Sequence, residues 1–294
     1  MEQWHINSQA FLPLREHPGH TESCCSGTCA KNRCIFIEML RCVNVLSGMT
    51  LTQKERMAGL GNVPRWVAYE HLARYEFAST FVKDRVVIDC ACGAGIGSRL
   101  FAASGARQVE AFDIAAGSFA QPGTAREPGN LRFRVAGAQM LPMPDQSADV
   151  YVSLETIEHL DDDRTFLAEV RRVLKPDGVF VCSTPDRTVT NPGRRLPDRV
   201  WNRFHLREYS RDEFVALLQT AFEEVQMHGQ NPQSAAWVKL IGVAGRFIPL
   251  HGAVRLNQAL KAPKLFTAKP EQHLVLPEQG RIFEYLVAVC RRPK

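Results

Sequence analysis

The sequence predicts an α/β fold with a mostly parallel sheet, and two observations carry this prediction. From about residue 64 onward, apolar segments typical of strands alternate with segments of helical periodicity. The stretch "DCACGAGIG", residues 89–97, is typical of a glycine-rich turn between a strand and a helix. The chain has 294 residues, 45% hydrophobic and 23% charged, which suits one large globular domain or one domain with an appendage.

Strands and helices are expected in a regular order. The expected strands are 85–90, 108–115, 130–135, 148–154, 178–185, 222–229 and 281–290. The expected helices are 64–79, one directly after the glycine-rich turn, 163–178 and 210–222. Ser210, with Glu213 three residues later, predicts a capping box at the start of the last of these helices.

Residues 1–48 show no sustained periodicity and predict a poorly ordered extension before a domain over 49–294. The nine cysteines are irregularly spaced, which argues against a disulfide framework and favours a reducing cytoplasm. The chain has no run of about 18 apolar residues, and its N-terminus lacks the cationic and apolar regions of a secretion signal. We therefore expect a cytoplasmic location.

Positive charge is concentrated near the C-terminus. The net charge of the whole chain is +5, but residues 231–294 hold ten Lys and Arg against three Asp and Glu. Residues 231–280 predict a basic helical insertion before the last strand, with apolar stretches around 235–247 and 252–262. Such a segment is compatible with a cap on the sheet, a lid over the acceptor or a peripheral contact with a membrane.

The glycine-rich turn predicts a ligand other than a dinucleotide. Its glycines let a ligand approach the backbone at the head of a helix. The dinucleotide pattern requires a third glycine at the position of Ser98, and the preceding strand carries Asp89, a poor neighbour for a pyrophosphate. A ligand with an adenosine and a cationic centre suits that carboxylate better. Asp113, at the end of the next strand, lies where a carboxylate receives two ribose hydroxyls.

Over roughly residues 64–230 the chain resembles the class I S-adenosylmethionine-dependent methyltransferases. The segments that carry the resemblance are "EHLARY", "VVIDCACGAGIG", "AFDI", "LPMPDQSADVYVSLETIEHL" and "FLAEVRRVLKPDGVFVCSTP". The resemblance implies a Rossmann-like, seven-stranded sheet whose last strand runs antiparallel. It also implies that S-adenosylmethionine lies across the carboxyl ends of the first strands.

The cofactor-binding residues that the resemblance implies are Asp89, Gly93, Gly95, Asp113, Ala138, Leu154, Tyr69 and His71. In this assignment Asp113 binds the ribose, Leu154 offers its carbonyl to the cofactor's amino group, and Tyr75 joins the residues that cover the sulfonium and carboxylate. One position departs from the family pattern. Gly137 stands where an acid usually accepts from the adenine amino group, so Gln139 is a candidate replacement for the missing acceptor.

The stretch "SLETIEHL", residues 153–160, follows the fourth expected strand, at the edge where ligands bind in such folds. Glu155, Glu158 and His159 are spaced i, i+3, i+4, so one helical turn would carry all three on one face. Two subgroups of the family share this E-x-x-E-H pattern and use a divalent metal there: ubiquinone-pathway O-methyltransferases and small-RNA 3′-terminal 2′-O-methyltransferases. In the RNA subgroup a further ligand precedes a stretch similar to "HLREYSRDEF", which here begins with His205.

Three interpretations of this stretch stay open. The resemblance implies a metal site for Mg, Mn, Zn or Fe(II), with Glu155, Glu158, His159 and His205 as ligands. Alternatively, His159 or His205 is the catalytic base beside Glu158, without a metal. In the third interpretation these residues only cap the following helix.

The resemblance predicts an S-adenosylmethionine-dependent methyltransferase, with oxygen of a small molecule or a glycan-type acceptor as the expected methyl acceptor. Arg194, Arg195 and Arg207 are candidate contacts for acceptor phosphates. Positive residues are scattered among apolar ones without an arginine-rich or aromatic stripe, which argues against nucleic acid. The alternatives are a metal-dependent RNA 3′-terminal 2′-O-methyltransferase and a catalytically silent, methyltransferase-like partner protein.

Overall fold

The computed structural model describes residues 65–115, 128–193, 200, 202–244, 274 and 282–294. The predicted extension 1–48, the domain start at 49, the helical stretch 252–262 and Arg194 and Arg195 lie outside the described residues. Of the basic insertion 231–280, the structure describes 231–244 and residue 274.

A seven-stranded sheet forms the centre of the fold, with the strand order β3-β2-β1-β4-β5-β7-β6. The strands are β1 (Val86–Cys90), β2 (Gln108–Asp113), β3 (Leu131–Val135), β4 (Ala148–Leu154), β5 (Leu174–Pro185), β6 (Phe222–Gln233) and β7 (Ile282–Pro293). Neighbouring strands pair in parallel except at β7, which is antiparallel to both β5 and β6. The predicted mixed sheet with an antiparallel last strand is confirmed.

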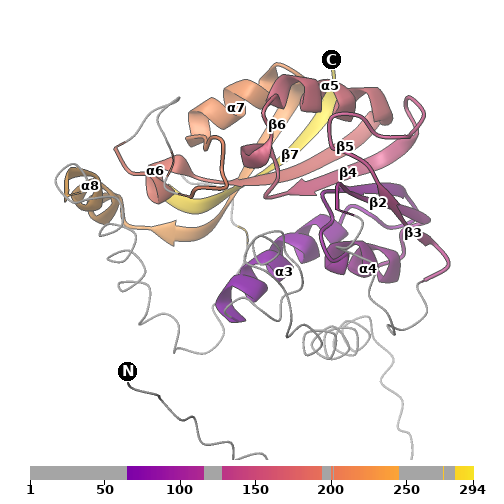
Figure 1. Ribbon diagram of the computed structural model, residues 1–294, viewed down its shortest axis with the longest axis horizontal. Helices are drawn as coiled ribbons and strands as arrows, with labels where there is room; N and C mark the ends of the chain where they lie inside the picture. Colours follow the sequence, from indigo (N-terminus) through magenta and orange to yellow (C-terminus); the bar gives the residue numbers. More distant parts are fainter. Residues whose placement is uncertain (1–64, 116–127, 194–199, 201, 245–273, 275–281) are drawn as a thin grey trace, which may run out of the picture. The chain divides into compact units, whose positions relative to one another are not determined.

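Helices cover both faces of this sheet. They are α3 (Arg65–Ser79), α4 (Ile96–Ala103), the 3₁₀ turn η4 (Ile157–His159), α5 (Asp163–Val173), α6 (Arg187–Thr190), α7 (Arg211–Gln219) and α8 (Ala235–Ala244). Figure 1 shows α5 and α7 on one face and α3 and α4 on the other, as expected for strands joined by crossover helices. None of the described helices is long and apolar enough to span a membrane.

The core under α5 and α7 is rich in aromatic side chains. Tyr151 of β4 and Phe180 of β5 pack edge to face with ring centroids 5.6 Å apart, and Phe180 stacks on Phe222 of β6 at the same distance. Phe166 of α5 packs on both Tyr151 and Phe180 and is fully buried. Burial of such rings supplies much of the free energy that holds a helix layer on a sheet.

Two predicted boundaries differ from the structure. The helix expected over 163–178 ends at Val173, and β5 begins at Leu174 rather than at residue 178. Pro176 favours an extended conformation at the residue before it, which ends the helix early. The pairing of β4 with β5 shifts register between Ala148 and Val150, which accommodates the additional strand residues.

A buried arginine connects α3 to the far strands. Arg74 is fully buried and donates to the side-chain oxygen of Gln230 on β6. Its guanidinium carbon lies 4.4 Å from the ring centroid of Tyr285 on β7, and its Nε lies 4.0 Å from a carboxylate oxygen of Glu155. Gln230 also donates to the backbone carbonyl of Glu70 on α3. Arg74 therefore joins the helix, two strands and the segment after β4 by one buried charge.

We expect Arg74→Leu to lower the free energy of unfolding by about 3 kcal/mol, because removing one partner of a buried ion pair leaves the other charge uncompensated. The measurement is urea unfolding followed by circular dichroism. Arg132→Leu is the matched control, since Arg132 is 68% exposed and pairs with Glu110 only at 3.7 Å. Equal and small decreases in the free energy of unfolding of both variants would contradict a structural role for Arg74.

Candidate functional site

The glycine-rich turn after β1 adopts a backbone that only small residues allow. Gly95 is the N-cap of α4 and has a φ of 74°, and a Cβ at this position would lie 2.4 Å from the ring of Phe133. At Gly97 an added Cβ would lie 2.0 Å from the ring of Tyr75 on α3. Glycine at both positions therefore lets two aromatic rings close over the turn.

Asp113, the predicted ribose-binding residue, is held beside this turn. One of its carboxylate oxygens accepts from the backbone N–H of Gly93 at 2.9 Å, and the other accepts from the N–H of Ala115 at 2.9 Å. Both bonds orient the carboxylate at the carboxyl end of β2. Gly93 and Asp113 lie side by side, as the assignment of both to one ligand requires.

Asp89 lies on β1, the strand beside β2, and its side chain is buried at the same edge of the sheet as Asp113. Its Oδ2 accepts from the hydroxyl of Ser98 at 2.5 Å, so the residue that replaces the third dinucleotide glycine serves as its hydrogen-bond donor. Burial raises the pKa of Asp89 to about 7, although the bond from Ser98 opposes this shift. Asp89 is therefore a carboxyl group that titrates near neutral pH.

The raised pKa of Asp89 makes stability depend on pH. The folded state binds the proton more tightly than the unfolded state, so the favourable contribution is complete below the unfolded pKa and is lost as the pH rises through about 7. We expect the stability of Asp89→Asn relative to the wild type to increase between about pH 4 and pH 8, by at most a few kcal/mol. Urea unfolding across this range measures the difference, and a pH-independent difference would contradict the assignment.

The three predicted covers on α3 lie in different environments, and Tyr75 is the one with a described contact at the glycine-rich turn. Tyr75 is buried and packs edge to face on Phe101 of α4, with ring centroids 5.9 Å apart. Burial, together with the nearby charge of Arg74, lowers the pKa of His71 well below 6.5, so this imidazole is neutral. Tyr69 is half-buried on the same helix.

The stretch after β3, predicted to contact adenine, leaves room at the position of the missing acid. Residue Ala136 donates to the backbone carbonyl of Asp113 at 3.1 Å, which places this stretch beside β2. A Cβ at Gly137 would meet no heavy atom of the described residues within 4 Å. The side-chain amide of Gln139 donates to Asp161 at 3.0 Å and to the carbonyl of Asp162 at 2.9 Å. Gln139 thus faces the start of α5.

The E-x-x-E-H stretch does not form the helical turn that its spacing predicts. Glu155 has a φ of 52°, and the 3₁₀ turn η4 begins only at Ile157. The carboxylate of Glu155 accepts from the hydroxyl of Ser183 on β5 at 2.6 Å, and the backbone N–H of Glu155 donates to Ser183 as well. Contacts with β5 therefore override the local helical preference, and Glu155 does not share a helical face with Glu158 and His159.

Leu154, the predicted backbone acceptor for the cofactor's amino group, ends β4 just before this bend. Its carbonyl accepts from the hydroxyl of Thr156 at 3.1 Å. Leu154 is buried, at 8% exposure, and its proposed contact with the cofactor stays a prediction.

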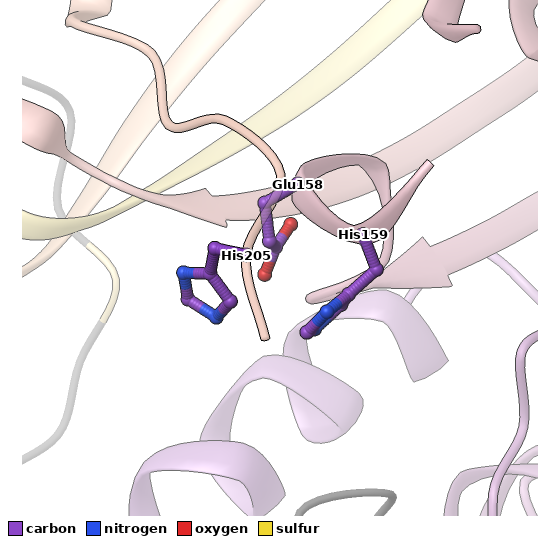
Figure 2. A group of neighbouring side chains, drawn as sticks. All are labelled: Glu158, His159 and His205. Carbon is purple, nitrogen blue, oxygen red and sulfur yellow. The ribbon is translucent and has the colours of Figure 1, made fainter. Parts of the chain in front are cut away.

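Three of the four predicted metal ligands come together. Among the described residues, Glu158, His159 and His205 form a group in which one ligand atom from each lies within 4.8 Å of the others. Figure 2 shows the Glu158 side chain beside the imidazoles of His159 and His205, which pack edge to face with ring centroids 4.8 Å apart. Glu155, the fourth predicted ligand, is not in this group. Its bond to Ser183 and its proximity to Arg74 account for the difference.

Glu158 is the most buried member of the group. It is 0% exposed, its Oε2 accepts from Thr184 at 3.2 Å, and its Oε1 has no hydrogen-bond partner among the described residues. Burial, and then the charge of Glu155, raise the pKa of Glu158 well above 4.5. A buried carboxylate oxygen without a donor is costly unless a ligand, a proton or a cation meets it.

Backbone contacts bring His205 to this place from a segment far along the chain. The carbonyl of Glu158 accepts from the N–H of Leu206 at 2.8 Å, and His159 Nδ1 lies 3.0 Å from the carbonyl of Phe204. Arg207 adds an ion pair with Asp163 at 2.9 Å. These contacts, which the sequence pattern does not reveal, decide that the two histidines meet.

Comparisons with known proteins identify the family to which the chain belongs. Residues 88–182 match the family model described as Methyltransferase domain. The chain is 37% identical over 180 residues to a probable S-adenosylmethionine-dependent methyltransferase of Mycolicibacterium smegmatis, a match that covers 61% of this chain and 67% of the relative. The chain belongs to the class I S-adenosylmethionine-dependent methyltransferases.

Two further matches of this methyltransferase cover other shares of the chain. It is 38% identical over 119 residues to a ubiquinone/menaquinone biosynthesis C-methyltransferase of Caulobacter vibrioides, covering 36% of this chain and 46% of that relative. A solved S-adenosylmethionine-dependent methyltransferase of Thermotoga maritima has the same fold, with a TM-score of 0.53 and 14% identity over 82% of this chain and 99% of that one.

The carboxyl edge of the sheet fits the cofactor that the family uses. Asp113 offers an oriented carboxylate, and the open space at Gly137 lies beside it. Ile114 and Met140, which the sequence interpretation did not single out, are 67% and 80% exposed, although both are large and apolar. Exposed apolar side chains near the predicted cofactor residues would suit the faces of a purine. Ile114 could have been identified from its place directly after Asp113.

We expect Gly137→Asp to strengthen binding of S-adenosylhomocysteine by roughly three- to tenfold, because the new carboxylate would accept from the adenine amino group. Isothermal titration calorimetry measures the affinity, with Gly137→Ala as the matched control for backbone stiffening. A Cβ at position 137 meets no described heavy atom within 4 Å, so neither variant is strained at its first side-chain atom. An Asp variant that binds no more tightly than the Ala variant would mean that adenine lies elsewhere.

Proposed function

We propose that this methyltransferase transfers the methyl group of S-adenosylmethionine to a hydroxyl oxygen of a small-molecule or glycan-type acceptor. The observation that carries the proposal is the group of Glu158, His159 and His205, which follows β4 at the carboxyl edge of the sheet. Ligands of open α/β sheets bind outside this edge. The cofactor supplies a methyl group activated by a positive sulfonium.

His159 is the base in this proposal. A backbone carbonyl can only accept, so the contact between His159 Nδ1 and the carbonyl of Phe204 places the proton of the neutral ring on Nδ1. Nε2 then carries the lone pair that removes the proton of the acceptor hydroxyl as its oxygen attacks the methyl group. The His159 side chain is exposed, which gives the acceptor access to it. Alignment of the acceptor supplies the rest of the rate enhancement.

A second candidate adds a divalent metal to the same group. One carboxylate and two imidazoles suit Mn, Fe(II) or Zn, and Mg would require more oxygen ligands. The orphaned Oε1 of the fully buried Glu158 favours this candidate, because a cation would compensate it. Glu158, His159 and His205 would hold the metal, which would lower the pKa of the acceptor hydroxyl. Glu155 would remain on Ser183.

The surroundings favour a small or glycan-type acceptor over RNA. Leu206 is 60% exposed beside His205. Arg207, a predicted phosphate contact, is engaged with Asp163 and with the carbonyl of Asp161. Because the charge of Arg207 is paired with Asp163 and Leu206 is exposed, this surface suits a partly apolar acceptor better than a phosphate backbone. Membrane contact through 231–280 stays a prediction.

The proposal is tested with ¹³C-methyl-labelled S-adenosylmethionine and a panel of hydroxylated small molecules and glycans. We expect a methoxy product, recognised by its ¹³C shift. We also expect His159→Gln to lower kcat by about 10²- to 10⁴-fold with unchanged cofactor affinity. His228→Gln is the matched control. The His228 ring packs on Phe77 of α3, with ring centroids 4.7 Å apart, and lies outside the group of Glu158, His159 and His205.

The same assay separates the two candidates. Activity that survives exhaustive chelation supports the metal-free base. Activity that is lost and then restored by Mn²⁺ or Zn²⁺ supports the metal. A product methylated on carbon or nitrogen, with no methoxy signal from any acceptor, would refute oxygen transfer.

A further inference from the structure

We infer that Glu208 is a positioning residue for the proposed acceptor site. Its buried carboxylate holds the imidazole of His205 in the tautomer that keeps a lone pair on Nε2. This inference rests on the proposed function for the site, but it concerns a residue outside the group of Glu158, His159 and His205.

The carboxylate of Glu208 is fixed on both sides. The residue is 1% exposed, and its Oε1 lies 2.5 Å from His205 Nδ1. Its Oε2 accepts from the side-chain amide of Asn191 at 2.6 Å and from the hydroxyl of Thr190. Both oxygens are therefore committed to donors, and the carboxylate cannot turn away without leaving a buried donor unpaired.

The surrounding bonds decide the tautomer of His205. The backbone N–H of Phe204 donates to Asn202 Oδ1 at 3.1 Å, which fixes the orientation of the Asn202 side-chain amide. The amide nitrogen of Asn202 therefore faces His205 Nε2, at 2.9 Å, and donates to it. Nε2 accepts, so Nδ1 of the neutral ring carries the proton and donates it to Glu208.

This arrangement has a consequence for the site. The Nε2 lone pair of His205 is the one that a metal ion or an acceptor hydroxyl would use, and the amide of Asn202 takes that direction in this structure. A ligand would displace the Asn202 amide, while Glu208 would keep the ring from turning or exchanging its tautomer. In the same way, the carbonyl of Phe204 accepts from Nδ1 of His159 and fixes that ring. Both imidazoles are thus held through Nδ1, the pattern that accompanies histidines acting through Nε2.

Substitution of Glu208 by glutamine is a sharp test, because glutamine has the same shape but only one acceptor oxygen. It cannot accept from both His205 and Asn191, so its amino group must face one of these donors. The measurement is long-range ¹H–¹⁵N correlation NMR of ¹⁵N-histidine-labelled full-length protein at about pH 8, where imidazoles are neutral. His205→Gln assigns the signal, and Glu208→Ala provides a second variant.

In the wild type we expect the His205 signal of a ring protonated on Nδ1. In Glu208→Gln and Glu208→Ala we expect a mixture of tautomers or the form protonated on Nε2. Glu223→Gln, which changes an exposed carboxylate on β6, should leave the signal unchanged. A wild-type tautomer retained in both Glu208 variants would overturn the inference.

Two further measurements keep this result separate from the proposed function. Calorimetry with S-adenosylhomocysteine checks that each variant remains folded and binds the cofactor product as the wild type does. A Co²⁺ titration of the wild type and Glu208→Gln should show a 10- to 100-fold loss of affinity in the variant if the group binds metal. Absence of Co²⁺ binding in the wild type would count against the metal candidate, while the NMR signals would still decide the role of Glu208.

Discussion

The shared direction of six strands is the constraint on which the site depends. In the described sheet, β7 runs against its neighbours and every other pairing is parallel. Parallel strands place all their carboxyl ends at one edge, and each crossover returns the chain to the opposite edge. The ends of β1, β2 and β4 therefore bring the glycine-rich turn, Asp113 and Glu158 to a single edge.

The second requirement is that a segment beyond β5 returns to the end of β4. The residues that follow α6 do this through backbone bonds to Glu158 and through the ion pair of Arg207 with Asp163. Each bond contributes little stabilisation by itself, but together the bonds hold the segment after α6 against the turn η4 and the start of α5. A group of side chains drawn from two segments gains its geometry from such mutual bonding.

This arrangement costs free energy because it buries carboxyl groups away from water. Asp89 and Glu158 are both buried carboxyl groups, and burial raises the pKa of each. Arg74 is a buried charge as well, and its Nε lies 4.0 Å from a carboxylate oxygen of Glu155. Proteins retain such unfavourable groups mainly where a ligand or a reaction uses them. The concentration of buried carboxyl groups at one edge therefore agrees with a site for a cationic cofactor.

The fold class and the seven-stranded sheet with its antiparallel last strand could be predicted from the sequence, because periodicity, the glycine-rich turn and motif spacing are local signals, while the candidate cofactor residues stay predictions. The helical turn predicted at Glu155 was wrong, since its contact with Ser183 on β5 outweighs the local preference. The helix was expected to run to residue 178 but ends at Val173, because Pro176 favours extended backbone before it and Leu174 pairs with Ala148 of β4.

By itself, the sequence determined that this chain is a class I methyltransferase and where its acids and glycines stand along the sheet. Only the tertiary structure decided that His205 meets His159, that Glu155 stays apart from them, and that Glu208 holds the His205 ring. These contacts join β4 to β5 and to the loop beyond it, which are far apart in the sequence. Their free energy comes from bonds that no local pattern encodes.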